Sequence, residues 1–155
     1  TAQQVRSLTK KRVEVVPSQT IPQGIAAILA FSYEASFEDN VAAMERALAG
    51  VQTIEVTNAV RSTRINGMQI EEGQAIALLD DQLVSATDSY RDALLQALKK
   101  ARTEGLEVAT IYYGAGVSRE EADAVAESVR QVLPEIEVEL IEGGQPHYNY
   151  IVSLE

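Results

Sequence analysis

The fold is decided by residues 107–140, which read EVATIYYGAGVSREEADAVAESVRQVLPEIEVEL. Residues 107–113 are typical of a strand, and Ser118 followed by Glu121 is the capping-box pattern of a helix start. The apolar face of this predicted helix comprises Ala122, Val125, Ala126 and Val129. A second strand is predicted beyond Pro134, because apolar residues alternate at Ile136, Val138 and Leu140. A strand, a helix and a strand of these lengths predict a right-handed βαβ unit.

The segments on either side of this unit add antiparallel strands. Residues 51–85 are rich in β-formers and predict a small antiparallel meander, with turns at Asn66 and Gly67 (a type I′ hairpin), at residues 72–73 and at residues 80–81. A helix is then predicted between a cap at Thr87 or Asp88 and a stop at Gly105. After the βαβ unit a turn at residues 143–144 leads into a final strand, in which the alternating residues are Tyr148, Tyr150, Val152 and Leu154.

The first third of the chain has helical patterns instead. Residues 1–8 resemble the end of a helix, and a β-branched run over residues 12–16 stops at Pro17. Thr20 and Ser36 are the predicted caps of two further helices, the second of which ends at Gly50. We therefore expect a mixed α/β protein with two parts. These are residues 1–49, the end of an α/β lobe truncated at its N-terminus, and residues 50–155, a C-terminal mixed α/β domain.

Composition narrows the classes of partner. Lys and Arg number 13 against 23 Asp and Glu, a formal net charge of −10. Such a surface repels nucleic acid and suits a basic protein partner, although acidity that only provides solubility is an equally good interpretation. The chain has no Cys, no apolar run of membrane-spanning length and no signal peptide, which favours a cytoplasmic protein without an integral membrane segment. Because the sequence opens on Thr1 rather than Met, we expect residues to be missing before it.

Two motifs could carry chemistry, and each has a simpler interpretation. His147 is the sole histidine; it could act as a base, but no carboxylate is evidently placed to orient it, and an exposed loop position is favoured. Gly114 and Gly116 stand between a strand and a capped helix, where backbone N–H groups could hold an anion. The pattern lacks the third glycine of a dinucleotide fingerprint and the lysine of a P-loop, so a tight turn is favoured.

Arg61 and Arg64 are positive charges in an acidic chain. On a strand their odd spacing places them on opposite faces, so they form no single clamp, but either could bind a phosphate or carboxylate. A cross-strand ion pair with Glu55 or Glu71 is the favoured alternative. No Ser–His–Asp arrangement, metal-ligand spacing, catalytic carboxylate pair or kinase nucleotide motif is present.

Further surface features suit protein contacts. Glu120, Glu121, Asp123 and Glu127 form an acidic helix surface that is either merely solvated or offered to a basic partner. The chain's notable aromatics suit either an interface or core packing, and are Tyr112, Tyr113, Tyr148 and Tyr150.

Three segments together carry a family resemblance. Residues 15–27 (VVPSQTIPQGIAA) resemble a VVPTKSIPQGIAAL signature, residues 55–61 (EVTNAVR) resemble EVTYAVR, and GGQP at residues 143–146, followed by a tyrosine-rich strand, resembles a C-terminal GGQPLYYYL. In this order they resemble the ATP-binding subunit of bacterial fatty acid kinase, a dihydroxyacetone kinase-like family. His147 stands where that pattern has Leu, which argues against a catalytic role.

The resemblance implies a division of labour. ATP and Mg²⁺ would bind an N-terminal kinase domain that is absent here, so this part would need no cofactor and would not be catalytic alone. Its fold would be a DegV- or dihydroxyacetone-kinase-like lobe, and its partner a DegV-like fatty-acid-binding protein. The alternatives are a lobe that binds an acyl chain or phosphorylated metabolite, and a homodimerisation domain. The resulting candidates for partner or ligand binding are Arg61, Arg64, Gly143, Gly144, Gln145, Pro146 and Tyr148.

Overall fold

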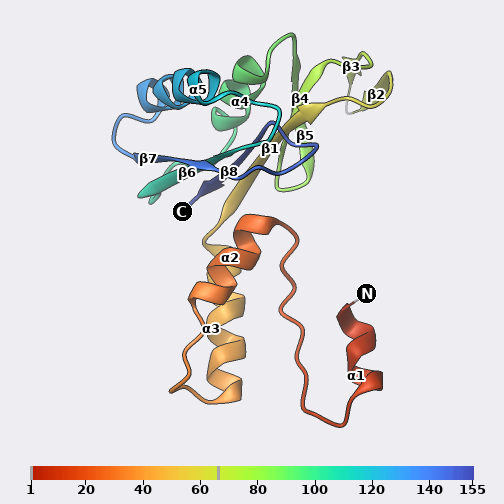
Figure 1. Ribbon diagram of the computed structural model, residues 1–155, viewed down its shortest axis with the longest axis vertical. Coiled ribbons are helices and arrows are strands. Elements are labelled where there is room, and N and C mark those ends of the chain that lie inside the picture. The colour runs from red at the N-terminus through yellow and green to blue at the C-terminus, as the bar shows by residue number, and fades with distance from the viewer. Residues whose placement is uncertain (1, 66) are drawn as a thin grey trace. The chain divides into compact units, whose positions relative to one another are not determined.

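The computed structural model describes residues 2–65 and 67–155, and these fall into two compact units, Thr1–Val51 and Gln52–Glu155. The mixed α/β class predicted from the sequence is confirmed (Figure 1). Within the described residues, no helix combines the length and the apolar character needed to cross a bilayer.

The first unit is helical. A 3₁₀ turn at Ala2–Gln4 precedes three helices, which are α1 (Val5–Leu8), α2 (Ile21–Leu29) and α3 (Phe37–Ala49). Both predicted caps are confirmed: Thr20 Oγ1 accepts from the Gln23 amide at 3.3 Å, and Ser36 Oγ accepts from the Asp39 amide at 3.1 Å. The β-branched run over residues 12–16 forms no strand, because no strand in this unit is available to pair with it.

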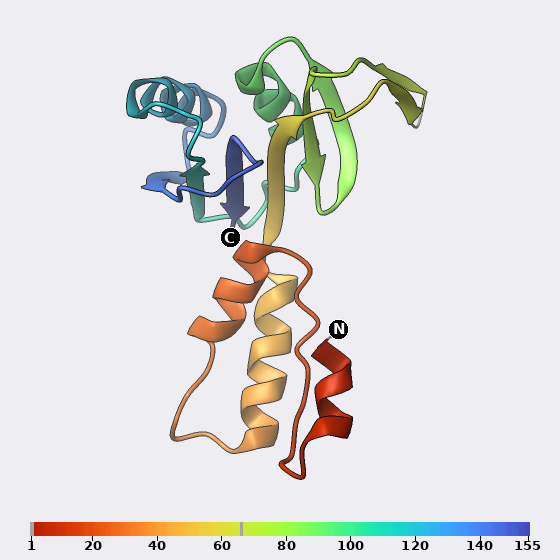
Figure 2. The ribbon, with the colours of Figure 1, turned by 45° about the vertical axis from the view of Figure 1, so that its right-hand side comes forward.

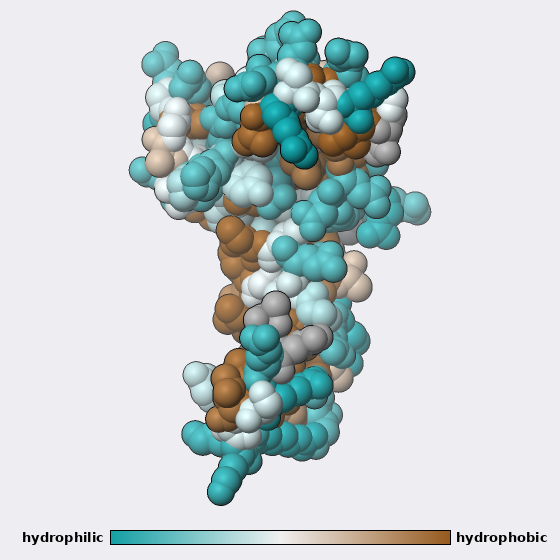
Figure 3. Space-filling view, turned by 90° about the vertical axis from the view of Figure 1, so that its right-hand side faces the viewer, coloured by the Kyte–Doolittle hydropathy of each residue, from teal (hydrophilic) through white to brown (hydrophobic). Residues whose placement is uncertain are grey.

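Helix α2 packs against α3 but leaves apolar side chains at the surface. Ile21, Ile28 and Leu29 are 59%, 69% and 77% exposed. Their spacing places them on one side of the helix. Figure 3 shows hydrophobic side chains gathered at the surface of this unit.

The second unit is built on a six-stranded sheet in the order β5-β4-β1-β8-β6-β7. Its strands are β1 (Gln52–Asn58), β4 (Ala75–Leu79), β5 (Gln82–Thr87), β6 (Val108–Tyr113), β7 (Glu137–Glu142) and β8 (Tyr150–Leu154). Helices α4 (Tyr90–Leu98) and α5 (Arg119–Val132) lie on the same side of the sheet in Figures 1 and 2. Their apolar residues join one face of the strands in a single hydrophobic core.

The βαβ unit predicted from residues 107–140 is present. Strands β6 and β7 pair in parallel, with Ile111 opposite Leu140, and α5 connects them. Ser118 and Glu121 form the predicted capping box, in which the Ser118 hydroxyl accepts from the Glu121 amide and the Ser118 amide donates to the Glu121 carboxylate. Local sequence therefore determines this part of the fold.

The predicted meander is present with one change. Strand β4 pairs antiparallel with β1 and with β5. The turn between β4 and β5 contains Asp80 and Asp81, with φ of 47° and 64°. The hairpin β2 (Thr63–Ile65) and β3 (Met68–Ile70) forms a separate two-stranded sheet rather than part of the meander. Asn66, the first residue of the predicted type I′ turn, lies outside the described residues, so the turn type stays a prediction.

Three predicted boundaries are wrong. Ser89, not Thr87 or Asp88, caps α4, because its hydroxyl accepts from the Asp92 amide at 3.1 Å, and the helix ends at Leu98, well before Gly105. The last strand begins at Tyr150, so Tyr148 lies in the loop before it. All five residues of β8 are buried, because β8 lies between β1 and β6. The predicted alternation of buried and exposed residues is therefore absent from β8.

Candidate functional site

Most of the predicted binding residues lie in the loop over residues 143–149, which returns the chain from β7 to β8. The amides of Gly143 and Gly144 both donate to the carbonyl of Tyr113, at 3.0 and 3.2 Å. The side-chain amide of Gln145 donates to the carbonyl of Tyr112 at 3.0 Å. These groups hold the loop against the end of β6, so a structural role accounts for the GGQ sequence.

Gly114, directly after β6, also helps to hold the loop over residues 143–149 in place. Its amide donates to the Asn149 carbonyl at 2.9 Å, and the Ala115 amide donates to the Gln145 carbonyl at 3.1 Å. A Cβ at position 114 would overlap the carbonyl oxygen of Tyr148. The glycine is therefore required by close backbone approach, as the tight-turn interpretation predicts, and not by an anion.

The start of α5 is already occupied by its own side chains. Ser118 Oγ and its backbone N–H both hydrogen-bond Glu121, and these bonds hold the pKa of the Glu121 carboxyl below its ordinary value. A carboxylate at this helix terminus satisfies the positive end of the helix dipole. The anion site considered from the sequence is thus filled by the chain itself.

Arg61 and Arg64 are not brought together with the loop over residues 143–149. Arg64 lies in β2 and Arg61 just before it, and both are exposed. Over the described part of the chain, neither forms an ion pair, so the favoured pairing with Glu55 or Glu71 is wrong. For Glu55 the cause is register: Glu55 lies opposite Leu78 and Ile151 in the large sheet, whereas the arginines belong to the separate hairpin segment.

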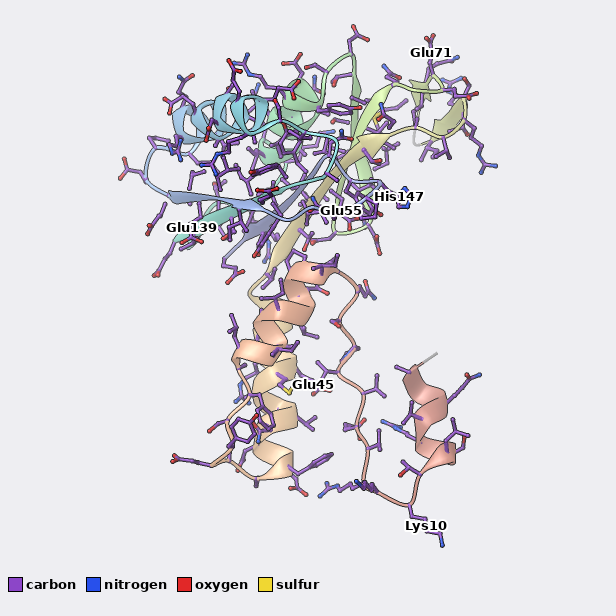
Figure 4. All side chains as sticks on the ribbon, viewed as in Figure 1. Lys10, Glu45, Glu55, Glu71, Glu139 and His147 are labelled. Carbon is purple, nitrogen blue, oxygen red and sulfur yellow. The ribbon has the colours of Figure 1, made fainter. Side chains whose placement is uncertain are left out.

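His147 projects into solvent (Figure 4). Its backbone has a φ of 72°, and its carbonyl accepts a hydrogen bond from Thr57 Oγ1 at 2.5 Å. None of its described hydrogen bonds involves the imidazole, as expected for an exposed loop residue. Across the described residues, no group of three or more His, Cys, Asp or Glu side chains is arranged to hold a metal ion.

The face of the large sheet opposite α4 and α5 is a candidate surface that the sequence did not reveal. The strand register aligns one row of residues across β4, β1, β8, β6 and β7, and a second row lies beside it on β1, β8, β6 and β7. We call this surface the open face, and it comprises Leu78, Glu55, Ile151, Tyr112 and Ile141 in the first row and Thr53, Ser153, Thr110 and Glu139 in the second, with Glu137 at the β7 edge. Ile151, Thr53, Ser153 and Thr110 are buried, so the exposed part of the open face is on β7, with Glu55, Leu78 and Tyr112 half-buried. Figure 4 labels Glu55 on β1 and Glu139 on β7.

The open face carries negative charge without compensation. The six strands of the large sheet contain no Lys or Arg, and three of their four Glu lie on the open face, namely Glu55, Glu137 and Glu139. Burial, and then the nearby carboxylate of Asp81, raise the pKa of Glu55. Burial, followed by Glu155 and Glu139, raises the pKa of the Tyr112 hydroxyl, and burial, followed by Glu55 and Asp81, does the same for the pKa of Tyr148. Burial is the main cause of all three pKa shifts, the neighbouring carboxylates add to it, and no cation is among the causes.

Tyr148, in the loop before β8, lies near Glu55 of the open face. Its hydroxyl is close enough to Glu55 and Asp81 for their charges to raise its pKa, after the larger effect of burial. Pro146 is exposed, and its carbonyl accepts from the Tyr148 amide at 2.9 Å. The sequence did contain one relevant signal, which is that no strand of the large sheet has a Lys or Arg. This signal could not identify the open face, because the order of the strands is not known from the sequence.

The described depressions are lined mostly by acidic or apolar groups. One of about 550 Å³ lies beside the base of the β2–β3 hairpin, and its ionisable lining residues are Glu71, Glu72, Asp88 and Tyr90. A smaller one of about 290 Å³ lies between the starts of α4 and α5; its lining is largely apolar and includes Arg91, Glu121 and Tyr150. Burial, with Glu121 and Tyr90, raises the pKa of Tyr150 to about 12. Neither depression offers the paired cations that a phosphate group prefers.

Comparisons with known proteins agree with this architecture. A family model that describes the C-terminal region of FakA-like fatty acid kinase proteins matches residues 1–155. The chain is 36% identical to Protein YloV of Bacillus subtilis over 154 residues, which make up 99% of this chain and 28% of that protein. It is 35% identical to an uncharacterized protein of Staphylococcus haemolyticus over 152 residues, 98% of this chain and 28% of that one. The chain therefore spans little more than a quarter of the length of these relatives.

A solved structure has a similar fold. It is a DegV family protein from Thermus thermophilus, and its title describes fatty acid binding. The TM-score is 0.53 at 13% sequence identity, and the match covers 86% of this chain and 55% of that one. At this identity the likeness concerns the fold alone.

Proposed function

Since the chain belongs to the family of C-terminal regions of FakA-like fatty acid kinase proteins, we propose that it is a docking region rather than a catalytic one. It binds a DegV-like fatty-acid-binding protein and holds that protein where a kinase domain elsewhere in the full-length protein can phosphorylate the fatty acid. ATP and Mg²⁺ belong to that kinase domain and not to residues 1–155.

One observation carries this proposal: within the described residues, the open face offers unpaired carboxylates beside an exposed apolar side chain. The open face combines carboxylates with Tyr112 and with Ile141, which is 42% exposed. Tyrosine and aliphatic side chains beside unpaired charge are typical of protein interfaces. By contrast, His147 has no described carboxylate partner, and the described residues hold no metal-binding cluster.

A second candidate function is a ligand-binding lobe for an acyl chain or a phosphorylated metabolite. The similarity in fold to a protein described by its fatty acid binding favours it. The charges oppose it, because Glu71, Glu72 and Asp88 line the larger depression and would repel a carboxylate or phosphate. We therefore rank docking first. Homodimerisation is a third candidate, for which the exposed apolar side of α2 is the supporting feature.

The test is direct binding. The 155-residue chain is titrated by calorimetry with the DegV family fatty-acid-binding protein of the same organism, loaded with oleate. We expect a complex with a Kd of about 10 μM or tighter, within the range of transient complexes. No heat and no pull-down at several hundred micromolar, roughly ten-fold or more above that Kd, would overturn docking.

Two parallel measurements separate the alternatives. A thermal-shift series with oleate and with glycerol 3-phosphate tests the ligand-binding lobe, for which a rise in Tm is expected only if that candidate is correct. Light scattering over a range of protein concentrations tests homodimerisation. Docking alone predicts no shift with either ligand and a constant monomer mass.

A further inference from the structure

The large sheet has two faces and two edges. One face and both edges are occupied by other groups of the chain. One face is covered, because α4 and α5 pack their apolar residues against it. At the β5 edge, the Lys100 ammonium donates to the carbonyl of Val84. At the β7 edge, the Arg130 guanidinium donates to the carbonyl of Val138 at 3.3 Å. Cationic side chains that occupy edge carbonyls hinder the addition of a further strand, so a partner that extends the sheet is disfavoured.

The remaining boundary within this unit is the open face, and its composition suits a protein contact. Ile141 is 42% exposed beside the half-buried Tyr112. Glu137 and Glu139 are exposed on the same side of β7, and the Thr110 hydroxyl donates to Glu139 at 3.2 Å. Exposed apolar and charged side chains thus lie together on the β7 side of the open face, the combination of groups that protein interfaces use.

Charge distinguishes the open face from the acidic surface of α5. On α5, Asp123 pairs with Arg119 at 3.1 Å, and Glu127 lies 3.5 Å from Arg130. Among the described residues, none of Glu55, Glu137 and Glu139 forms an ion pair. The helix acids are thus partly neutralised by their own helix, whereas the acids of the open face are not. A cation from another molecule gains most by approaching the open face.

We propose that the open face is the docking surface, and that its occupant is a protein surface rich in Lys and Arg with an apolar centre that meets Ile141 and Tyr112. This inference rests on the proposed function, since it names the surface through which the DegV-like partner binds. The partner's cations approach Glu55, Glu137 and Glu139. Docking here leaves α4, α5 and both sheet edges free.

The experiment compares variants of the 155-residue chain in the same calorimetric titration. Glu139→Lys reverses a charge on the open face, and Ile141→Ser removes its exposed apolar side chain. Glu120→Lys is the matched control, because it makes the same change of charge at an exposed position on α5. Circular dichroism and thermal melting of each variant confirm that it is folded.

We expect Glu139→Lys to weaken binding about ten-fold or more at low salt, and to lose most of this difference in roughly 0.5 M NaCl, since salt screens charge pairs. Ile141→Ser should weaken binding about three- to ten-fold at both salt concentrations, because an apolar contact is not screened. Glu120→Lys should change the Kd less than about two-fold, the scatter of exposed substitutions.

Three other results of these titrations would each contradict one part of the proposal. If the unsubstituted chain does not bind, the proposed function fails. If it binds and both open-face variants bind equally well, docking stands but the open face is not its site. If Glu120→Lys alone weakens binding, the partner occupies the acidic surface of α5 and the inference is wrong.

Discussion

Gly114 and Tyr148 approach so closely that residue 114 has no room for a side chain: a Cβ there would overlap the Tyr148 carbonyl oxygen and lie 2.8 Å from that of Gln145. The contact joins the end of β6 to the loop that leads into β8, two segments far apart in the sequence. Since β8 is buried between β1 and β6, the position of this loop determines how the central strand enters the sheet.

We therefore predict that Gly114→Ala destabilises the protein by about 1–3 kcal/mol, the cost of overpacking a site that backbone atoms enclose. The measurement is urea denaturation followed by circular dichroism. Gly116→Ala is the control, because a Cβ at position 116 meets nothing within 4 Å. That substitution should leave stability unchanged or raise it by up to about 1 kcal/mol. Equal effects from the two substitutions would contradict the close contact.

The capping box of α5 gives a second prediction. Ser118→Ala removes the hydroxyl that accepts from the Glu121 amide and donates to its carboxylate, so we expect a loss of about 0.5–2 kcal/mol at neutral pH. The pKa of Glu121 is lowered in the folded state, first by the Ser118 side chain and then by its backbone N–H. The carboxylate's contribution is therefore present above the ordinary pKa of 4.5 and lost as pH falls through the lowered value.

Denaturation at about pH 7 and about pH 3 tests this sign. The stability difference between the unsubstituted protein and Ser118→Ala should shrink in acid, because the carboxyl begins to protonate. Glu120→Gln, in the same helical turn, should show no comparable dependence. A difference that stays constant between the two pH values would mean that Glu121 takes no part in the cap.

For Glu55, stability is expected to depend on pH in the opposite direction. Burial and Asp81 raise its pKa, so folding penalises its charged form. The penalty is complete above the raised pKa and disappears below the ordinary value of 4.5. Glu55→Gln should therefore raise Tm by about 1–3 °C at neutral pH, and this gain should vanish as the pH falls towards about 4. If Glu55 also meets a cation of the partner, the same substitution weakens docking.

Differential scanning calorimetry from about pH 4 to about pH 8 measures the first effect. Glu71→Gln is the control, because Glu71 is exposed and is not part of any strand of the large sheet. A variant at position 55 that is less stable than the parent at neutral pH would show that the carboxylate is stabilised rather than penalised.

Local features of this fold were predictable, and its surface was not. The capping box at Ser118, the caps at Thr20 and Ser36, and the parallel pair β6–β7 depend on residues near one another in the chain. The open face depends on β8 lying between β1 and β6, which places Ile151 beside Glu55 and Tyr112. Pairing between strands so distant in sequence leaves no local pattern.

The same reason explains the wrong prediction for the arginines. Glu55 and Arg64 were expected to share one meander, because both occur in consecutive β-rich sequence. In the structure the hairpin β2–β3 pairs only with itself, and Glu55 pairs with residues of β4 and β8. Hydrophobic alternation identifies strands but does not say which strands are neighbours.

The closed edges of the large sheet give the last prediction. Lys100 occupies the Val84 carbonyl on the edge strand β5, a group that would otherwise be available to a strand from another molecule. Lys100→Ala should therefore promote association that increases with protein concentration, measured by light scattering from about 10 to 500 μM, a range that brackets weak self-association. Lys99→Ala makes the same change of charge at the neighbouring exposed residue, and it should remain monomeric if the parent is. Association of both variants to the same degree would attribute the effect to net charge, whereas association of Lys100→Ala alone identifies the uncovered edge as its cause.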